Sequence, residues 1–453
     1  ICLGIGTYNL REPLTVTGAK SLRFRGQGWA SLLVGSAPGA IIDISASTGV
    51  ALENLSLVAS ATSSSTTAAL RAHNTVDLRA EHINVLCLAT GEGASAAIGL
   101  GGNMLGVSID DCALVAERGI VRIGEHLLSA ELRVTRNLFF CSQRAVNLDG
   151  ISLHYGNTRI DGNLVINGNQ PALVASGAVL PGSPFTIEGN VIYTLGDGIR
   201  AGVDGLRITG NEISGGERSG DGIVIEEGLD PEGIRDVRIE GNRLSQLQGN
   251  AIALHQPLEH AAIDGNLIED IGLGALVMGE AGAVEHLSVN GNRCRNLGLQ
   301  ANDQGTAFAA VQLLRVARGD FSDNLVAEVA RGALLSPAIA GLRALAVGQL
   351  RVEDNRFFGI GPDRSSGELV AIQIVPPFDS AMLEGNQVDR VGDDPQQKPE
   401  PAIWRAILIA PTALRNPGNF STGYLVAAPD NAYLLTANRA FAVARRPADL
   451  AIQ

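Results

Sequence analysis

The chain contains very little lysine and few aromatic residues. Lys20 and Lys398 are the only lysines among 453 residues, Phe, Trp and Tyr together make up 4%, and the formal net charge is −13. Nucleic acids and anionic membrane surfaces both require clustered cations on the protein. The composition therefore excludes both as partners. Few aromatic rings are present to line a sugar-binding groove by apolar contact.

Long apolar runs and paired cysteines are lacking as well. No stretch approaches the roughly 20 apolar residues of a membrane-spanning helix, so we expect no membrane span. Five cysteines are present, and no two have metal-ligand spacing: Cys2, Cys87, Cys112, Cys141 and Cys294. Their odd number and apolar settings indicate small core residues, with a disulfide as the alternative.

A repeated segment dominates the sequence. FTIEGN, LRITGN, VRIEGN, AAIDGN and LSVNGN end at positions 190, 211, 242, 266 and 292, so successive copies are 21, 31, 24 and 26 residues apart. Each copy alternates apolar and outward residues, which is the period of a strand with one buried face. Gly accepts backbone angles that a side chain forbids, and Asn tolerates the left-handed region, so the Gly-Asn pair predicts a sharp corner.

The same template covers most of the chain. It recurs at Asn137, Asn163, Asn324, Asn355 and Asn386, with weaker forms at Gln27, Glu81 and Cys112 and fainter copies near Asn419 and Asn438. A second apolar run separates successive corners, so each repeat holds at least two strands. Such a repeat buries its apolar face only by stacking on its neighbours. The sequence therefore predicts an all-β solenoid with strands at 132–135, 206–209 and 237–240.

This pattern resembles the right-handed parallel β-helix repeat of the pectin-lyase-like superfamily. The resemblance implies a single domain over residues 1–453, with roughly 14–16 rungs and an asparagine ladder along one edge. A leucine-rich-repeat-like solenoid is the alternative, because LRITGNEI also fits its template. Both ends of the chain read as strands without a cap, so we expect a segment of a longer polypeptide, or ends covered by partner chains.

The resemblance does not carry the catalytic motifs of the superfamily. Polygalacturonase-like members have Asn-Thr-Asp, paired Asp, Gly-His-Gly and Arg-x-Lys motifs, of which only Asp110-Asp111 is present. Alginate-epimerase-like members have Asp-Pro-His, where this chain has Asp230-Pro231-Glu232. A pectate-lyase-like set of calcium-binding acids with an Arg or Lys base cannot be assembled.

Residues at equivalent places in adjacent repeats should form columns. One outward column is arginine, and the next is acidic; the arginines are 133, 159, 207, 238 and 351, and the acids are 110, 161, 188, 240, 264, 353 and 384. Such columns fit binding of uronic acids or a cation. We favour the alternative of a solvated face whose charges pair laterally.

Two sets of residues are candidates for catalysis. Asp197 and Asp221 fall in the GDG turns before the second run, and two carboxylates one rung apart would match the separation in retaining glycosidases. Asp before Gly is also a common turn dipeptide. Glu226 and His255 follow the second strand of adjacent repeats and could act as base and orienter. Glu227 and Asp230 could then hold a divalent cation.

A further column contains histidines. His260 and His286 each stand six residues before their asparagine, in line with Asp236 and Arg318. Chance coincidence of surface charges explains such a column as well as a site does.

Two functions remain open. The sequence favours a non-catalytic β-helical rod without a cofactor, acting as scaffold, spike or binding segment of a larger bacterial surface or phage-tail-like particle protein. The alternative is a polysaccharide lyase, glycoside hydrolase or epimerase on acidic glycans, with Ca²⁺ if it is a lyase. Polysaccharide or protein chains are the expected partners, a homo-oligomer is one option, and we expect an extracellular or particle-associated location. Fold alone does not decide between the two functions.

Overall fold

The computed structural model describes most of the chain as two compact units. The first comprises Ile1–Ser214 and Glu226–Ile234, and the second Gly215–Ile225 and Arg235–Gln453. The residues described are 1–35, 39–59, 67–87, 95–149, 152–226, 234–301, 307–333, 338–362, 367–390, 403–409, 432–436 and 439–442.

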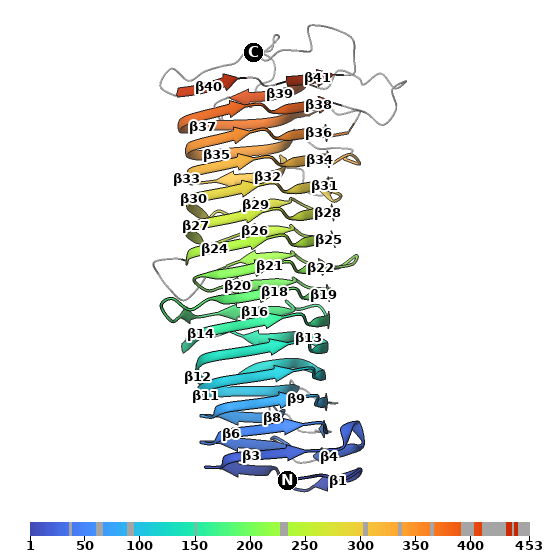
Figure 1. Ribbon diagram of the computed structural model, residues 1–453. Coiled ribbons are helices and arrows are strands. Elements are labelled where there is room, and N and C mark those ends of the chain that lie inside the picture. The colour runs from blue at the N-terminus through green and yellow to red at the C-terminus, as the bar shows by residue number, and fades with distance from the viewer. Residues whose placement is uncertain are drawn as a thin grey trace. The chain divides into compact units, whose positions relative to one another are not determined.

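Each unit is a stack of repeats in which three strands recur, and like strands of successive repeats pair in parallel (Figure 1). We call the three resulting sheets the corner sheet, the following sheet and the third sheet. Described helix is limited to one 3-10 turn, η1 (Gly28–Ala30). The predicted parallel all-β solenoid is confirmed. The leucine-rich alternative is wrong, because a strand occupies the place where that fold would need a helix.

The corner sheet consists of the strands that end at the Gly-Asn corners. In the first unit these are β3 (Lys20–Arg25), β6 (Thr48–Glu53), β9 (Val76–Glu81), β14 (Ser152–Asp161), β18 (Phe185–Glu188), β21 (Leu206–Thr209) and the ends of β11 (Ser95–Asp110) and β12 (Ala113–Thr135). In the second unit they are β24 (Ile234–Glu240), β27 (Pro257–Asp264), β30 (Ala283–Asn290), β33 (Val316–Ser322), β40 (Ala432–Thr436) and the ends of β35 (Ala338–Glu353) and β37 (Glu368–Glu384). The predicted strands at 132–135, 206–209 and 237–240 all belong to it.

The following sheet begins directly after each corner. Its first-unit strands are β1 (Gly6–Leu10), β4 (Ser31–Gly35), β7 (Ser56–Ala59), β10 (Asn84–Cys87), β13 (Leu138–Leu148), β15 (Leu164–Asn167), β19 (Val191–Thr194), β22 (Glu212–Ser214) and the start of β12. Its second-unit strands are β25 (Arg243–Leu247), β28 (Leu267–Ile271), β31 (Arg293–Leu297), β34 (Leu325–Val329), β36 (Arg356–Ile360), β38 (Gln387–Arg390) and β41 (Arg439–Ala442).

The third sheet closes each repeat. It contains β2 (Leu14–Thr17), β5 (Ile42–Ser45), β8 (Thr67–His73), β16 (Leu173–Ser176) and β20 (Ile199–Gly202) in the first unit, with parts of β11, β12 and β13. The second unit contributes β23 (Ile223–Ile225), β26 (Ile252–Leu254), β29 (Leu276–Met278), β32 (Phe308–Leu314), β39 (Ile403–Ile409) and the starts of β35 and β37. A short extra strand, β17 (Ala178–Val179), pairs with β14.

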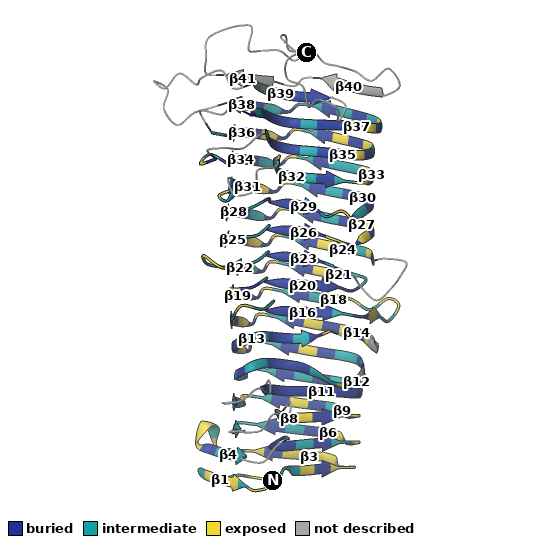
Figure 2. Cartoon of the chain, turned by 180° about the vertical axis from the view of Figure 1, so that it is seen from behind, coloured by how far each residue is buried: buried dark blue, intermediate teal, exposed yellow. Residues whose placement is uncertain are grey.

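The core of each unit lies between the three sheets (Figure 2). In β21 the side chains of Leu206 and Ile208 are fully buried, and Arg207 between them is exposed. Leu206 pairs with Phe185 of the neighbouring strand, so apolar residues stack on apolar residues from one repeat to the next. The buried cysteines fit the same pattern: Cys87, Cys112, Cys141 and Cys294 are free and buried, and Cys2 is exposed. The interpretation of the cysteines as core residues is confirmed for those four.

The corners are built from a left-handed residue followed by a buried one. Where a glycine precedes a ladder asparagine, its φ is about 62–66°, at Gly162, Gly189, Gly210, Gly241, Gly265, Gly291 and Gly385. The glycine, and not the asparagine, therefore takes the left-handed conformation. Where glycine is missing, Asp111, Arg136, Asp323 and Asp354 adopt φ of 49–55° instead.

The asparagines form the predicted ladder in both units. Asn137, Asn163, Asn190 and Asn211 are linked in the first unit, and Asn242, Asn266, Asn292, Asn324, Asn355 and Asn386 in the second; in each step the side-chain amide donates to the next Oδ1 at 2.8–3.0 Å. All ten are at most 2% exposed. Nine of these amides, those other than Asn242, also donate to a backbone carbonyl, as Asn163 does to Val134. The ladder thus satisfies buried backbone groups at every corner.

The ladder does not extend to the first repeats. Glu81 pairs with Asp110, two residues before Cys112, so the corner position of that repeat is Ile83 and the assignment to Glu81 is wrong. The sequence does not show this corner because His82, with a φ of 51°, takes the left-handed position that glycine occupies in later repeats. Leu55 and Ile83, both fully buried, fill the corner with apolar side chains. Asn419 and Asn438 lie outside the described residues.

Candidate functional site

A groove of about 1030 Å³ lies on the outward face of the corner sheet in the second unit. It crosses six neighbouring strands, β24, β27, β30, β33, β35 and β37. At about 4.8 Å per strand its length is roughly 24 Å. Its lining includes three arginines, four carboxylates and two histidines: Arg238, Arg318, Arg351, Asp236, Glu240, Asp264, Asp320, His260 and His286. A groove of this length fits an extended ligand better than a single compact one.

The two histidines form one wall of the groove. His260 pairs in register with His286, and His286 pairs with Arg318. The two imidazole rings stack with centroids 4.8 Å apart and planes inclined by 11°. The predicted alignment of His260, His286 and Arg318 is confirmed. Their stack offers a flat ring surface in a chain that has few other aromatic side chains to line a groove.

Small residues form the floor of the groove. The middle outward column contains Ala262, Ser288 and Asp320 in register, where other repeats carry arginine. Arg351 pairs with Asp320 and closes one end of this stretch, and Arg238 of β24 lies at the other end. The groove is hollow because the side chains between the two arginines are short.

The arginines of the groove differ in whether a carboxylate lies close enough to neutralise their charge. Arg238 lies 3.7 Å from the Asp236 carboxylate, and Arg351 forms an ion pair with Glu353. Arg318 is exposed and makes no ion pair or hydrogen bond with the other residues that the structure describes. Its guanidinium can therefore accept an anionic group of a ligand without breaking an existing pair.

Asp264 is the most perturbed acid of the groove. Burial raises the pKa of its carboxyl above the usual value, and the charge of Glu240 acts in the same direction. Its Oδ1 accepts a hydrogen bond from the Asn290 backbone N–H at 3.0 Å and one from Ser288 at 3.4 Å. A carboxyl with a raised pKa is suited to donate a proton, so Asp264 could serve as a general acid.

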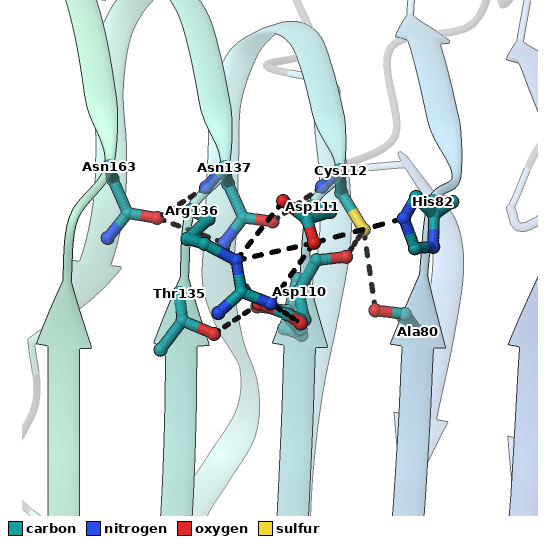
Figure 3. Close-up of polar contacts among 10 residues, drawn as sticks. Ala80, His82, Asp110, Asp111, Cys112, Thr135, Arg136, Asn137 and Asn163 are labelled. Atoms are coloured by element: carbon teal, nitrogen blue, oxygen red, sulfur yellow. Dashed lines mark hydrogen bonds and ion pairs between the residues drawn. The ribbon is translucent and has the colours of Figure 1, made fainter.

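A second hollow, of about 500 Å³, lies on the corner sheet of the first unit. Figure 3 shows its charged neighbourhood, in which Arg136 forms ion pairs with both Asp110 and Asp111. His82 lies 3.8 Å from Asp111 on the other side. The carboxylates of this cluster already face cations, and Arg136 lowers the pKa of Asp111. We therefore interpret this cluster as a network of charges that pair with one another across neighbouring strands.

Other members of the arginine and acid columns also pair with each other. Arg159 contacts Asp161 at 3.0 Å and Glu188 at 3.2 Å. These side chains are about a third to a half exposed, so each pair contributes little to stability. Outside the groove, the columns favour the interpretation as a solvated, laterally paired face.

The predicted catalytic residues of the first unit share one arginine. Arg200 donates to Asp197 at 2.5 Å and contacts Glu226 at 3.3 Å. Asp197 is only 15% exposed, and its backbone carbonyl accepts a hydrogen bond from Ala172. Asp197 therefore has a structural role in the turn. Glu226 is linked to Asp197 because both carboxylates contact Arg200.

The predicted residues of the second unit lie in separate surroundings. Asp221 accepts hydrogen bonds from the backbone and side chain of Asn250, whose own Oδ1 accepts the Gly274 N–H at 3.1 Å. This column supports the turns, as the common Asp-Gly turn dipeptide predicts. His255 is exposed, and its backbone N–H donates to Ile225. The pairings of Asp197 with Asp221 and of Glu226 with His255 join the two units and stay predictions.

Glu227 and Asp230 lie outside the described residues. Within the described ranges, no three His, Cys, Asp or Glu side chains gather in a way that could hold a metal ion. No described helix is long and apolar enough to cross a membrane.

Comparison with known proteins agrees with the fold. A family model described as a right-handed β-helix region matches residues 141–312. No curated protein matches the sequence significantly.

Three solved structures are similar at low identity. The catalytic unit of a thermostable α-1,3-glucanase from Streptomyces thermodiastaticus strain HF3-3 is 14% identical, with 96% of this chain and 62% of that chain covered and a TM-score of 0.38. The tailspike protein of E. coli bacteriophage HK620, in complex with a hexasaccharide, is 11% identical, with coverages of 90% and 71% and a TM-score of 0.42. The A-module of a mannuronan C-5 epimerase from Azotobacter vinelandii is 12% identical, with coverages of 96% and 90% and a TM-score of 0.35. The chain thus spans less than two thirds of the glucanase unit, and likenesses at these TM-scores carry no argument about function.

Proposed function

Because the chain is a right-handed parallel β-helix protein, we propose that it is a non-catalytic binding segment of a larger bacterial surface or phage-tail-like particle protein, and that its groove holds an acidic polysaccharide. The observation that supports this most is Arg318, an exposed cation next to a stack of two imidazole rings. A carboxylate-bearing sugar combines an anionic group for the arginine with a flat apolar face for the rings.

The dimensions of the groove support a polymer. Its volume of about 1030 Å³ lies at the upper end of the roughly 300–1,000 Å³ range of small-molecule sites. The carboxylates along it, such as Asp236 and Glu240, can accept hydrogen bonds from sugar hydroxyls between the charged contacts. We therefore expect several sugar residues to bind along the strand-stacking direction.

Replacing Arg318 by Gln should weaken binding of acidic oligosaccharides by about tenfold. The substitution removes one charge-assisted hydrogen bond, worth about 1.5–3 kcal/mol when formed, and solvent exposure reduces this toward 1.4 kcal/mol, which is tenfold. Titration calorimetry with alginate and polygalacturonate fragments measures the change, with dextran fragments as the neutral comparison. Arg293→Gln is the matched control, because Arg293 is exposed on β31, outside the groove lining. Equal affinity for acidic and neutral fragments would refute the proposal.

A polysaccharide-active enzyme is the second candidate. The raised pKa of Asp264 favours it, since glycoside hydrolysis uses a carboxyl with a raised pKa as general acid and a second carboxylate, and Glu240 is another acid of the groove lining. The predicted Glu226 and His255 are a rival site, with Ca²⁺ at Glu227 and Asp230 if the enzyme is a lyase. Turnover lost in Asp264→Asn would place catalysis in the groove. Turnover lost in Glu226→Gln/His255→Gln, or on calcium removal, would place it at the rival site.

A further inference from the structure

The following sheet of the first unit exposes a continuous group of apolar side chains. Leu138, Phe140, Leu164, Ile166, Tyr193 and Leu195, here called the apolar patch, are 40%, 56%, 40%, 39%, 49% and 49% exposed. They lie on or directly after β13, β15 and β19; β13 and β19 are labelled along the same edge of the structure in Figures 1 and 2. The groove lies in the other unit, so the patch is a separate feature.

The strand register places the patch residues, except Leu195, in two adjacent columns. Leu138 pairs with Leu164, which pairs with Val191, and Phe140 pairs with Ile166, which pairs with Tyr193. On the preceding strand, Ala113 and Val115 continue the two columns. On β10 the first column becomes polar at Asn84, whereas the second continues with Leu86, and on β22 the two columns reach Glu212 and Ser214. Both columns are therefore apolar across the four neighbouring strands β12, β13, β15 and β19, of which the last three carry the patch, and polar residues follow them on β22.

No outward side chain within these limits carries a charge. The segments involved read ALVA, LFFCS, LVIN and VIYTL, in a chain of which 18% is charged. A two-fold symmetric contact sets each patch against an identical one, so any charge inside it would meet its own kind. An uncharged patch avoids this repulsion and can be complementary to itself.

The area of the patch suits such a contact. Six large apolar side chains, each 39–56% exposed, present roughly 600 Å², which is the upper limit of the largest apolar patch on ordinary monomers. Two copies packed face to face would bury roughly 1,200 Å² in total, the lower end of stable protein interfaces. Two sheet faces pack in this way at about 10 Å separation.

We propose that the apolar patch is a dimer interface, through which two copies of this chain associate by their following sheets. The contact is isologous and uses no residue of the groove lining. Dimerisation would present two grooves on one particle and raise avidity for a polymer that reaches both.

Sedimentation equilibrium of the 453-residue chain tests this interface. We expect a species with the mass of two 47.1 kDa chains at micromolar concentration. Phe140→Ser/Tyr193→Ser should weaken association at least tenfold, whereas Trp29→Ser should not, because Trp29 is 75% exposed but outside the patch. A monomeric wild type, or a double variant that associates as tightly as the wild type, would overturn the proposal.

A charge swap supplies an independent test if the double variant fails to fold. Ile166→Lys and Ile166→Glu should each be monomeric, since like charges would face each other across the two-fold axis. A mixture of the two should form a heterodimer. No recovery in the mixture, with both variants folded by circular dichroism, would contradict a contact between identical patches.

Discussion

Replacing Asn324 by Ala should lower the free energy of unfolding by roughly 4 kcal/mol, the sum of a few buried groups left unsatisfied at about 1–3 kcal/mol each. The Asn324 Oδ1 accepts hydrogen bonds from the Asn292 backbone N–H at 2.9 Å and side-chain amide at 3.0 Å. Its own amide donates to the Val289 carbonyl at 2.8 Å and to Asn355 Oδ1 at 3.0 Å. Alanine removes all four bonds and leaves the Val289 carbonyl and the Asn292 N–H without these partners at a buried corner.

Urea denaturation followed by circular dichroism measures this loss. The control is Asn103→Ala, because the Asn103 side chain is exposed and a surface change of this kind costs less than about 0.5 kcal/mol. An equally small effect at Asn324 would show that water satisfies the corner. Asn242→Ala should also destabilise its unit, since it removes the bond that the Asn242 amide donates to Asn266 at 3.0 Å.

Replacing Gly168 by Ala should destabilise the first unit by about 3 kcal/mol, at the high end of the cost of overpacking. A Cβ at Gly168 would lie 1.9 Å from the Ser142 carbonyl oxygen, and backbone atoms cannot rotate away as a flexible side chain can. Gly168 also donates its N–H to Cys141 at 2.9 Å, so moving the segment outward would break that bond. Glycine is required here by the close approach of two successive repeats.

Gly332→Ala is the matched control for Gly168. A Cβ at Gly332 would meet no atom within 4 Å, and its backbone does not adopt the left-handed conformation. There the substitution should be neutral or slightly stabilising, because alanine reduces the conformational freedom of the unfolded chain. Similar thermal midpoints for both variants would indicate that the repeats can separate at Gly168 at little cost.

The repeated corner made most of the fold predictable from the sequence. A Gly-Asn pair after an alternating segment has few structural interpretations, and stacking follows once it recurs. The first repeats were harder, because His82 takes the glycine position and Ile83 the asparagine position. A buried corner can be filled either by linked amides or by apolar side chains. The Gly-Asn pattern identifies only corners of the first kind.

The groove was predictable only in part. The alignment of His260, His286 and Arg318 follows from counting back from the asparagines. The hollow itself depends on Ala262 and Ser288, which are short where other repeats carry arginine. The sequence indicates the hollow only by an interruption in the arginine column. A column shows which residues are neighbours, but it does not show how deep the surface between them is.

The apolar patch is hidden in the sequence for a different reason. In LFFCS, Leu138 and Phe140 point outward and Phe139 and Cys141 inward, so the strand is apolar on both faces. Without alternation, the period cannot show which residues are exposed. The structure separates the two sets because the register of β13 is set by its neighbours on both sides.

Native mass spectrometry of the chain mixed with a purified acidic oligosaccharide in deuterated water tests the central claim most directly. We expect a complex that retains the intact oligosaccharide, binds about tenfold more weakly in Arg318→Gln and is unchanged in Arg293→Gln. Recovered sugar of unchanged mass would show that no bond was broken and no carbon-bound deuterium was incorporated. Shortened fragments, or a mass gain from deuterium left by epimerisation, would contradict a non-catalytic role, and the absence of any complex would contradict the binding role itself.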